Sequence, residues 1–260
     1  MKNDFPDNPI RLSVLFALLV SLVPALALAE ELRMYAAAGV KAPLMEMAAE
    51  FEKDHGQKIA LVFDTAGRAE QLFLADSGAV LLITTDKRIG DAEKDGKLKG
   101  GLSSPLADTV GGFAVPPGSP KPDLSTPEKL KTALIAAPHI VFSDPARGAT
   151  VGMHFMKVIE ALGIKEEVLK KSTLAKDGVE TMRMILTGKA DLGVTQLAEV
   201  VQANRASLVG PFPGEFDLAT TYSLWYRTDA APAVKTFVLI ATGPVGRSKL
   251  EKHGLRPSSR

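Results

Sequence analysis

The chain has 260 residues, of which 46% are hydrophobic, enough for the core of one large domain or two lobes. Its 31 basic and 30 acidic side chains almost cancel, which excludes the strongly basic surface of a nucleic-acid-binding protein. The absence of cysteine excludes disulfide bonds and thiol catalysis. A small anionic ligand is compatible with this charge, because a binding site relies on local dipoles rather than on net charge.

Residues 1–29 have the pattern of a secretory signal peptide. Two basic residues precede an apolar run over residues 12–28, and the segment ends in the small-x-small pattern Ala27-Leu28-Ala29. We therefore expect cleavage after Ala29 and a mature chain of residues 30–260 in the periplasm. The alternative is an uncleaved membrane anchor, which the cleavage pattern disfavours. No later apolar run is long enough to span a bilayer.

The start of the mature chain predicts a strand, a turn and a helix. Residues 32–36 form an apolar run of strand length, Ala37-Ala38-Gly39 carries no bulky side chain, and residues 40–55 place apolar side chains at helical spacing. A helix that begins in such a turn leaves backbone N–H groups free, and these groups and the helix dipole favour an anion. The plainer interpretation is an ordinary strand–helix connection of an α/β protein.

Further strand–turn–helix units follow. Residues 58–63 predict a strand, and residues 69–75 a helix, with Thr65, Ala66 and Gly67 where helix N-terminal amides would be free. The next expected elements are a strand over 79–83, a helix to about Gly96 and a helix from Pro127. Further strands are expected over residues 139–143, 172–175, 191–195 and 220–227. Further helices are expected over residues 153–162, 179–186, 233–240 and 243–253. Strands that alternate with helices indicate an α/β fold with mostly parallel sheets.

Two segments rich in Pro and Gly, residues 110–120 and 208–214, interrupt this alternation. We interpret them as crossovers between two lobes. Lobe 1 is then discontinuous, with residues 30–113 and 213–260, and lobe 2 consists of residues 114–212. Two lobes joined in this way leave a cleft between them, into which several of the free helix amides can point.

Several short motifs follow one another in a particular order. They are Ala36-Ala37-Ala38-Gly39-Val40, Lys53-Asp54-His55-Gly56, Phe63-Asp64-Thr65-Ala66-Gly67, Leu82-Ile83-Thr84-Thr85-Asp86, Ser143-Asp144-Pro145 to Gly152, Asp177-Gly178-Val179, Gly188 to Gly193, and Leu250 to Leu255. In this order and spacing the chain resembles the periplasmic substrate-binding proteins of molybdate-type ABC transporters, over nearly the whole mature length. The resemblance implies the two-lobed fold of a type II periplasmic binding protein.

The resemblance also implies a function and a ligand set. Members of that family bind a tetrahedral oxyanion through backbone amides and a few hydroxyls, without a metal, a cofactor or a charged counter-residue. They are monomers that meet the membrane only through an ABC transporter permease. The ligand-facing positions carried over to this chain are Gly39, Ala66, Thr150 or Val151, Val179 and Gln196.

Three of these positions depart from the family pattern. The family usually has serine at positions 39 and 66 and often tyrosine at 196, whereas this chain has Gly39, Ala66 and Gln196. Three hydroxyl donors are therefore missing, which predicts weak binding of molybdate. Backbone amides at the same positions can still donate to an anion.

Polar groups near the same loops suggest an alternative ligand. Thr65, Arg68, Arg147, Thr150 and Gln196 can build a site for a different anion, such as an organic di- or tricarboxylate, because arginine binds a carboxylate through two parallel hydrogen bonds. Three of them also have a structural interpretation: Arg68 and Arg147 as solvated side chains, and Thr150 as a helix cap.

Enzyme signatures are missing from the sequence. There is no G-x-S-x-G, H-E-x-x-H or G-x-x-x-x-G-K-[ST] motif, and the four histidines are scattered. We therefore expect a binding protein that is not an enzyme. The alternatives of another class are a ligand sensor and an enzyme on the same fold.

Overall fold

The structure, a computed structural model, describes Met1 and residues 31–258. The expected signal peptide lies outside the described residues, apart from Met1. The strands are β1 (Leu32–Ala37), β2 (Ile59–Asp64), β3 (Ala79–Thr85), β4 (Gly101–Ala114), β5 (Ile140–Ser143), β6 (Ser172–Ala175), β7 (Leu192–Gln196), β8 (Leu208–Pro211), β9 (Ala219–Arg227) and β10 (Arg256–Pro257). The α-helices are α1 (Lys41–His55), α2 (Ala66–Ala75), α3 (Asp86–Lys94), α4 (Pro127–Ala136), α5 (Thr150–Ala161), α6 (Lys165–Lys170), α7 (Gly178–Leu186), α8 (Leu197–Asn204), α9 (Pro232–Thr242) and α10 (Pro244–Lys252), with 3-10 turns η1 (Ala38–Val40), η2 (Pro145–Arg147), η3 (Arg205–Ser207) and η4 (Gly214–Phe216).

Two lobes share one continuous path of strands in the order β2-β1-β3-β9-β4-β7-β5-β6. In the first lobe β2, β1 and β3 are parallel, and in the second lobe β6, β5 and β7 are parallel. The antiparallel strands β9 and β4 lie between these two parallel groups. The predicted two-lobed α/β fold is confirmed.

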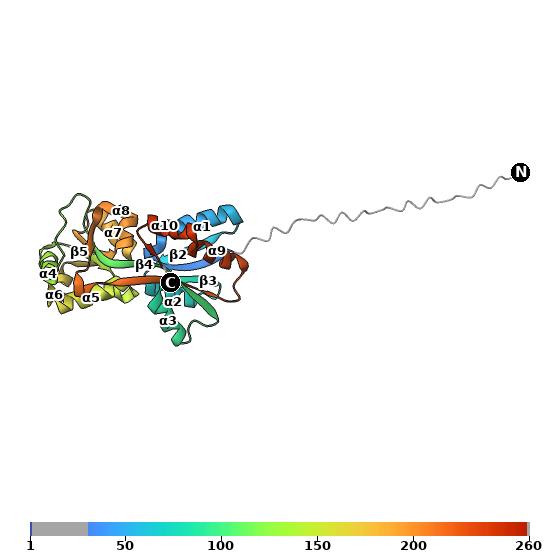
Figure 1. The fold of residues 1–260 in the computed structure, drawn as a ribbon, viewed down its shortest axis with the longest axis horizontal. Coiled ribbons are helices and arrows are strands. Elements are labelled where there is room, and N and C mark those ends of the chain that lie inside the picture. The colour runs from blue at the N-terminus through green and yellow to red at the C-terminus, as the bar shows by residue number, and fades with distance from the viewer. Residues whose placement is uncertain (2–30, 259–260) are drawn as a thin grey trace.

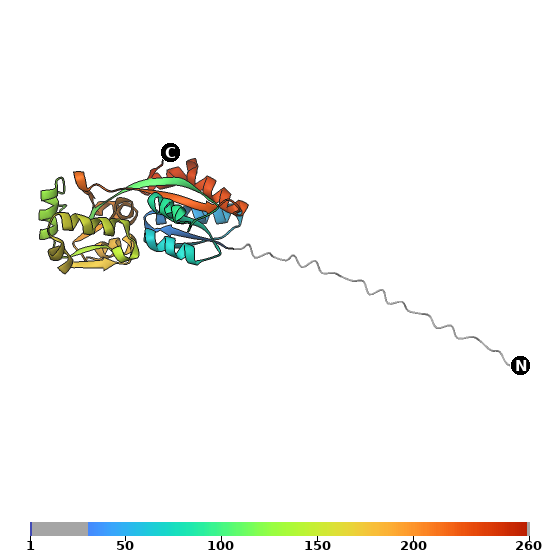
Figure 2. The ribbon, with the colours of Figure 1, turned by 90° about the horizontal axis from the view of Figure 1, so that it is seen from below.

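Strand β4 connects the lobes. Its first part, from Gly101 to Val110, pairs with β9, and its last part, from Gly111 to Ala114, pairs with β7. Figures 1 and 2 show β4 running from one lobe into the other, with α4, α5 and α6 at one end of the molecule and α1, α9 and α10 at the other. This crossing falls within the expected 110–120 segment; the exact lobe boundaries at 113/114 and 212/213 stay a prediction.

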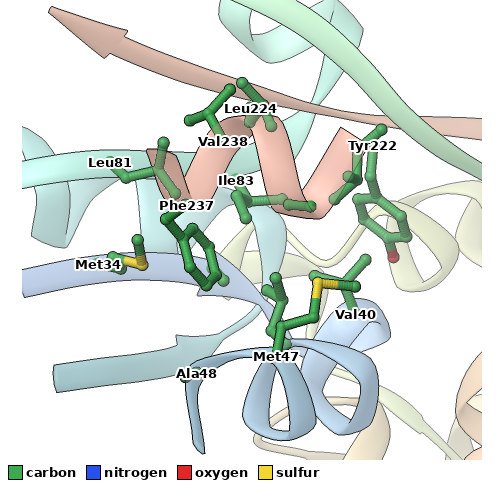
Figure 3. Packing of buried hydrophobic residues seen from close by; sticks show 14 of the residues in the cluster. Met34, Val40, Met47, Ala48, Leu81, Ile83, Tyr222, Leu224, Phe237 and Val238 are labelled. Carbon is green, nitrogen blue, oxygen red and sulfur yellow. The ribbon is translucent and has the colours of Figure 1, made fainter. Parts of the chain in front are cut away.

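Each lobe has its own hydrophobic core. In the first lobe α1, α9 and α10 cover one face of the sheet, and Met34, Met47, Leu81 and Phe237 are almost fully buried there. Figure 3 shows these side chains together with Tyr222, which lies beside Val40. In the second lobe the core is built around buried aromatic residues, namely Phe113, Phe142, Phe155 and Phe212.

Some predicted element limits were wrong. The helix expected from Met153 begins at Thr150, and the helix expected from Ala69 begins at Ala66. Each of these turns is tighter than the sequence suggested, so that the helix starts directly after the small-residue loop. Helices α6 and α8 and the first part of β4 had no counterpart in the prediction.

Candidate functional site

A small cavity lies between the two lobes. Its volume is about 30 Å³, room for two or three water molecules at roughly 10–15 Å³ each. The walls come from loops and helix starts of both lobes, and no lysine or arginine contributes to them. The lining residues are Ala37, Ala38, Gly39, Thr65, Ala66, Ser143, Ala149, Thr150, Val151, Gly178, Thr195, Gln196, Glu199 and Tyr222.

Helical segments begin at this cavity from several directions. The 3-10 turn η1 and the helices α2, α5, α7 and α8 all contribute their first residues or N-caps to its walls. The first N–H groups of a helix have no acceptor within the helix, and the helix dipole is positive at that end. The cavity therefore concentrates partial positive charge without a cationic side chain, which is the electrostatic setting of an anion site.

The start of α2 is held by hydrogen bonds around Thr65. This residue is the N-cap, and its hydroxyl accepts from the Arg68 N–H at 3.2 Å. The same hydroxyl donates to the Arg147 carbonyl in the other lobe. The Thr84 hydroxyl donates to the Ala66 carbonyl at 2.9 Å. These bonds fix the turn so that Thr65 and Ala66 line the cavity.

Tyr222, which reaches in from β9, explains the glycine at position 39. A Cβ added to Gly39 would lie 2.3 Å from the Tyr222 hydroxyl oxygen, so a larger residue would force the tyrosine or the turn to move. Tyr222 is 3% exposed, and its hydroxyl has no hydrogen-bond partner within residues 31–258. Burial, and secondarily the charge of Glu199, raise the pKa of Tyr222 well above its usual value. The hydroxyl is therefore a neutral donor at the place where the family pattern has a serine.

The start of α8 places two polar side chains at the cavity. Gln196 donates from Nε2 to the Thr220 hydroxyl at 3.0 Å. Glu199 accepts through Oε2 from the Gln196 N–H at 3.1 Å and from the Thr195 hydroxyl. Burial raises the pKa of Glu199 to about 7; the two hydrogen bonds oppose this shift, and the negative charge of Asp177 adds to it.

The structure brings six of the ten predicted site residues to the cavity, namely Gly39, Thr65, Ala66, Thr150, Val151 and Gln196. Four are not among the lining residues. Arg68 binds Gln71 on the exposed side of α2, and Arg147 forms an ion pair with Asp64. The Gly67 N–H donates to the Gly148 carbonyl at 3.1 Å. Val179 is 38% exposed and lines an outer groove, while the neighbouring Gly178 lines the cavity.

Sequence reasoning missed Glu199 and Tyr222. Glu199 had a local signal, because it follows Gln196 by three residues inside an apolar stretch, the spacing at which an acidic side chain returns to the start of its own helix. Tyr222 had none. Its importance arises only from contact with Gly39, which is distant in the sequence and lies on a different element.

Two general features bear on the class of protein. Within residues 31–258 no helix is long and apolar enough to cross a membrane. The same part of the chain contains no group of three or more His, Cys, Asp or Glu side chains arranged to hold a metal ion. Among the residues that line the cavity, Glu199 is the one with a carboxyl group, and none is a lysine or an arginine.

Comparison with known proteins adds to this geometry. A family model described as bacterial extracellular solute-binding protein matches residues 32–256. An aconitate isomerase from Pseudomonas sp is 23% identical over 254 residues, which cover 93% of this chain and 94% of that protein. The molybdate-binding protein ModA of Azotobacter vinelandii is 28% identical over 185 residues, which cover 71% of each chain.

The fold has counterparts among solved structures. The periplasmic molybdate-binding protein of Azotobacter vinelandii superposes with a TM-score of 0.68 at 18% sequence identity, and the match covers 86% of this chain and 98% of that one. At this identity the likeness establishes the shared two-lobed architecture. The model that matches residues 32–256 spans both lobes and the strands that connect them.

Proposed function

Because the chain belongs to the family of bacterial extracellular solute-binding proteins, we propose that it captures a small oxyanion between its lobes and delivers it to an ABC importer. The observation that carries this proposal is the convergence of helix N-termini on one cavity without a cationic side chain. The similarity to the molybdate-binding protein ModA of Azotobacter vinelandii supports the same chemistry.

The size of the cavity supports a compact ligand. A cavity of about 30 Å³ has to widen for any anion larger than a few water molecules, and a tetrahedral oxyanion requires less widening than a tricarboxylate. The donors proposed for the ligand are the backbone amides of Gly39, Ala66 and Val151 and the hydroxyl of Thr150, because the Thr65 hydroxyl and the Gln196 N–H donate to Arg147 and Glu199. The Tyr222 hydroxyl compensates for one of the three hydroxyls that the sequence lacks.

The setting of the protein in the cell is part of the proposal. We propose a monomer in the periplasm that is secreted through a cleaved signal peptide. Its partner is an ABC transporter permease, through which alone it meets the membrane. Its family and the molybdate-binding relatives support this setting.

The test is calorimetric titration of residues 30–260 with molybdate, tungstate, sulfate, phosphate and tricarballylate. We expect saturable one-site binding of at least one inorganic oxyanion. A ligand that binds only the folded protein also raises its melting temperature, which gives an independent check in a thermal-shift assay. Binding of tricarballylate alone would mean that the ligand is an organic anion rather than an inorganic oxyanion. The proposal would be overturned if none of the probes bound.

A second candidate function is the isomerisation of an unsaturated tricarboxylate. The observation that favours it is the Glu199 carboxyl in the cavity, because burial brings its pKa to about 7, where a group can remove and return a proton. The full-length similarity to an aconitate isomerase points the same way. The cavity volume disfavours it. Proton NMR of cis-aconitate incubated with the protein decides: a binding protein yields no trans isomer.

A further inference from the structure

Glu199 is a carboxyl group in the wall of a cavity whose other walls suit an anion. Its side chain lies where the start of α8 meets the start of α7: a Cβ added to Gly178 would lie 1.9 Å from Oε2 and 2.2 Å from Oε1. Oε2 accepts the two hydrogen bonds from Gln196 and Thr195. Within residues 31–258 Oε1 accepts none, and the residue borders both the cavity and an outer groove between α1, α7 and α8.

No cation neutralises this carboxyl in the part of the chain that the structure describes. The charged and titratable groups that face it are Asp177 at the start of α7, Tyr222 on β9, and Lys41 and Arg183, which line the outer groove. Lys41 lies over the Phe63 ring, and Arg183 is paired with Glu180. Further away on the elements packed against α8, Asp108 of β4 binds Thr221, and Arg205 begins η3.

An ionised Glu199 and an anion in the cavity would repel each other. Glu199 and Tyr222 are almost fully buried in the cavity wall, and the repulsion between two charges is stronger in such surroundings than in water. Burial already places the pKa of Glu199 near 7 without a ligand. A bound anion disfavours the ionised form further.

We propose that the cavity binds an oxyanion together with one proton, held between the ligand and the carboxyl of Glu199, so that Glu199 is a ligand contact that selects for proton content. This inference rests on the proposed function. A neutral Glu199 donates to a fully deprotonated oxyanion such as molybdate or sulfate. An ionised Glu199 accepts from an oxyanion that carries its own hydrogen, such as hydrogenphosphate. Both complexes contain the same single proton.

A purely structural role makes a different prediction. If Glu199 only holds the start of α8, through its bonds from the Gln196 N–H and the Thr195 hydroxyl, anion affinity does not depend on its protonation. Replacement by glutamine separates the two roles, because the amide oxygen can still accept both bonds while the amide nitrogen donates permanently toward the cavity.

The experiment is calorimetric titration of residues 30–260 with molybdate, sulfate and phosphate from pH 6 to pH 8.5, in two buffers of different ionisation enthalpy. For molybdate and sulfate we expect uptake of about one proton on binding at pH 8. Their affinity should fall up to roughly tenfold per pH unit above pH 7, because Glu199 must be protonated before the anion binds. Phosphate affinity should not fall between pH 7.5 and pH 8.5.

The variant Glu199→Gln should bind sulfate with affinity independent of pH and should lose the preference for phosphate over sulfate at pH 8.5. The matched control is Glu166→Gln, an exposed acidic residue in the first turn of α6 that does not line the cavity, which should keep the wild-type pH profile. Sulfate or molybdate binding without pH dependence or proton uptake would overturn this inference and leave the proposed function intact. Failure of all three anions to bind at any pH would overturn both. If Glu199→Gln does not fold, the proton uptake of the wild type decides.

Discussion

The guanidinium Nη2 of Arg147 lies 2.8 Å from Oδ1 and 2.6 Å from Oδ2 of Asp64. Asp64 ends β2 in the first lobe, and Arg147 belongs to η2 in the second. Beside this ion pair the Gly67 N–H donates to the Gly148 carbonyl, and the two glycines touch so closely that a Cβ on either would clash with the other. The two lobes are therefore joined next to the cavity, and Arg147 holds the lobes rather than the ligand.

Asp64→Asn should loosen this junction. The carboxylate is only 7% exposed, and a hydrogen bond to a charged group contributes about 1.5–3 kcal/mol, so ligand dissociation should become roughly tenfold faster or more. Stopped-flow measurement of dissociation tests this, with the radius of gyration from small-angle scattering as a second readout. The control is Asp123→Asn, whose pair with Lys129 is exposed. Equal dissociation rates in wild type and Asp64→Asn would contradict the role of the junction.

Gly39→Ala should abolish anion binding. The added Cβ would meet the Tyr222 hydroxyl at 2.3 Å, so either the tyrosine moves or the η1 turn does, and both line the cavity. Gly90→Ala is the matched control, because a Cβ at that helical position has nothing within 4 Å. Calorimetric titration gives the affinity and thermal unfolding gives the stability. Unchanged affinity in Gly39→Ala would show that the ligand binds elsewhere.

Tyr222→Phe should weaken binding without destabilising the fold. The hydroxyl has no partner within the described chain, so its removal leaves no other group unsatisfied, whereas loss of a donor to an anion costs about 1.5–3 kcal/mol. We expect affinity to fall roughly tenfold to a hundredfold. Tyr226→Phe, a change on the same strand outside the cavity, should bind like the wild type. Equal anion affinity in Tyr222→Phe and Tyr226→Phe would show that the Tyr222 hydroxyl does not contact the anion.

Glu46→Gln should reduce stability at neutral pH but not in acid. Hydrogen bonds from His253, Lys249 and Lys252 lower the pKa of Glu46 to about 2 and connect α1 to α10. A carboxyl with a depressed folded-state pKa stabilises the fold above its unfolded value near 4.5, and this contribution is lost as pH falls from about 5 toward 2.

The Glu46 side chain is 30% exposed, so water screens its ion pairs. We therefore expect Glu46→Gln to lower the free energy of unfolding at pH 7 by about 1 kcal/mol, which is less than the pKa shift alone implies. Urea denaturation at pH 7 and at about pH 2, the folded-state pKa of Glu46, measures the difference, with Glu52→Gln on the same helix as the control. An equal loss at both pH values would point to lost packing instead of lost charge.

Local patterns in the sequence predicted the units that surround the site but not the contacts between them. The turn before α1 was recognisable from Ala37, Ala38 and Gly39. These small residues stand between an apolar run of strand length and apolar residues at helical spacing, which indicates a strand–turn–helix connection. The sequence predicted a missing hydroxyl donor at Gly39, and only the three-dimensional structure shows that the Tyr222 hydroxyl lies next to that position. The effect on molybdate affinity stays a prediction. Gly39 in η1 and Tyr222 on β9 are far apart in the sequence, so no local sequence pattern reveals their contact.

The arginines illustrate the same limit. Arg68 lies in the first turn of α2 and Arg147 ends η2, both near the cavity, and the sequence could not show in which direction either side chain points. The nearby acceptors determine this: Gln71 is one turn away from Arg68, and Asp64 faces Arg147 from the other lobe. In the same way Glu199 is buried because α7 and α8 pack together, which composition alone does not predict.

The Val115 N–H donates to the Ser207 carbonyl at 3.0 Å, directly after β4 and directly before β8. The chain segment between these residues therefore starts and ends at adjacent points, and its replacement by another folded unit with neighbouring termini would need almost no additional loop closure. The pairing of β4 with β9, which holds the first lobe together, lies before this segment on one side and after it on the other. Phe113 and Phe212 lie outside this segment but belong to the core of the second lobe, so an exchanged segment has to pack against these two side chains.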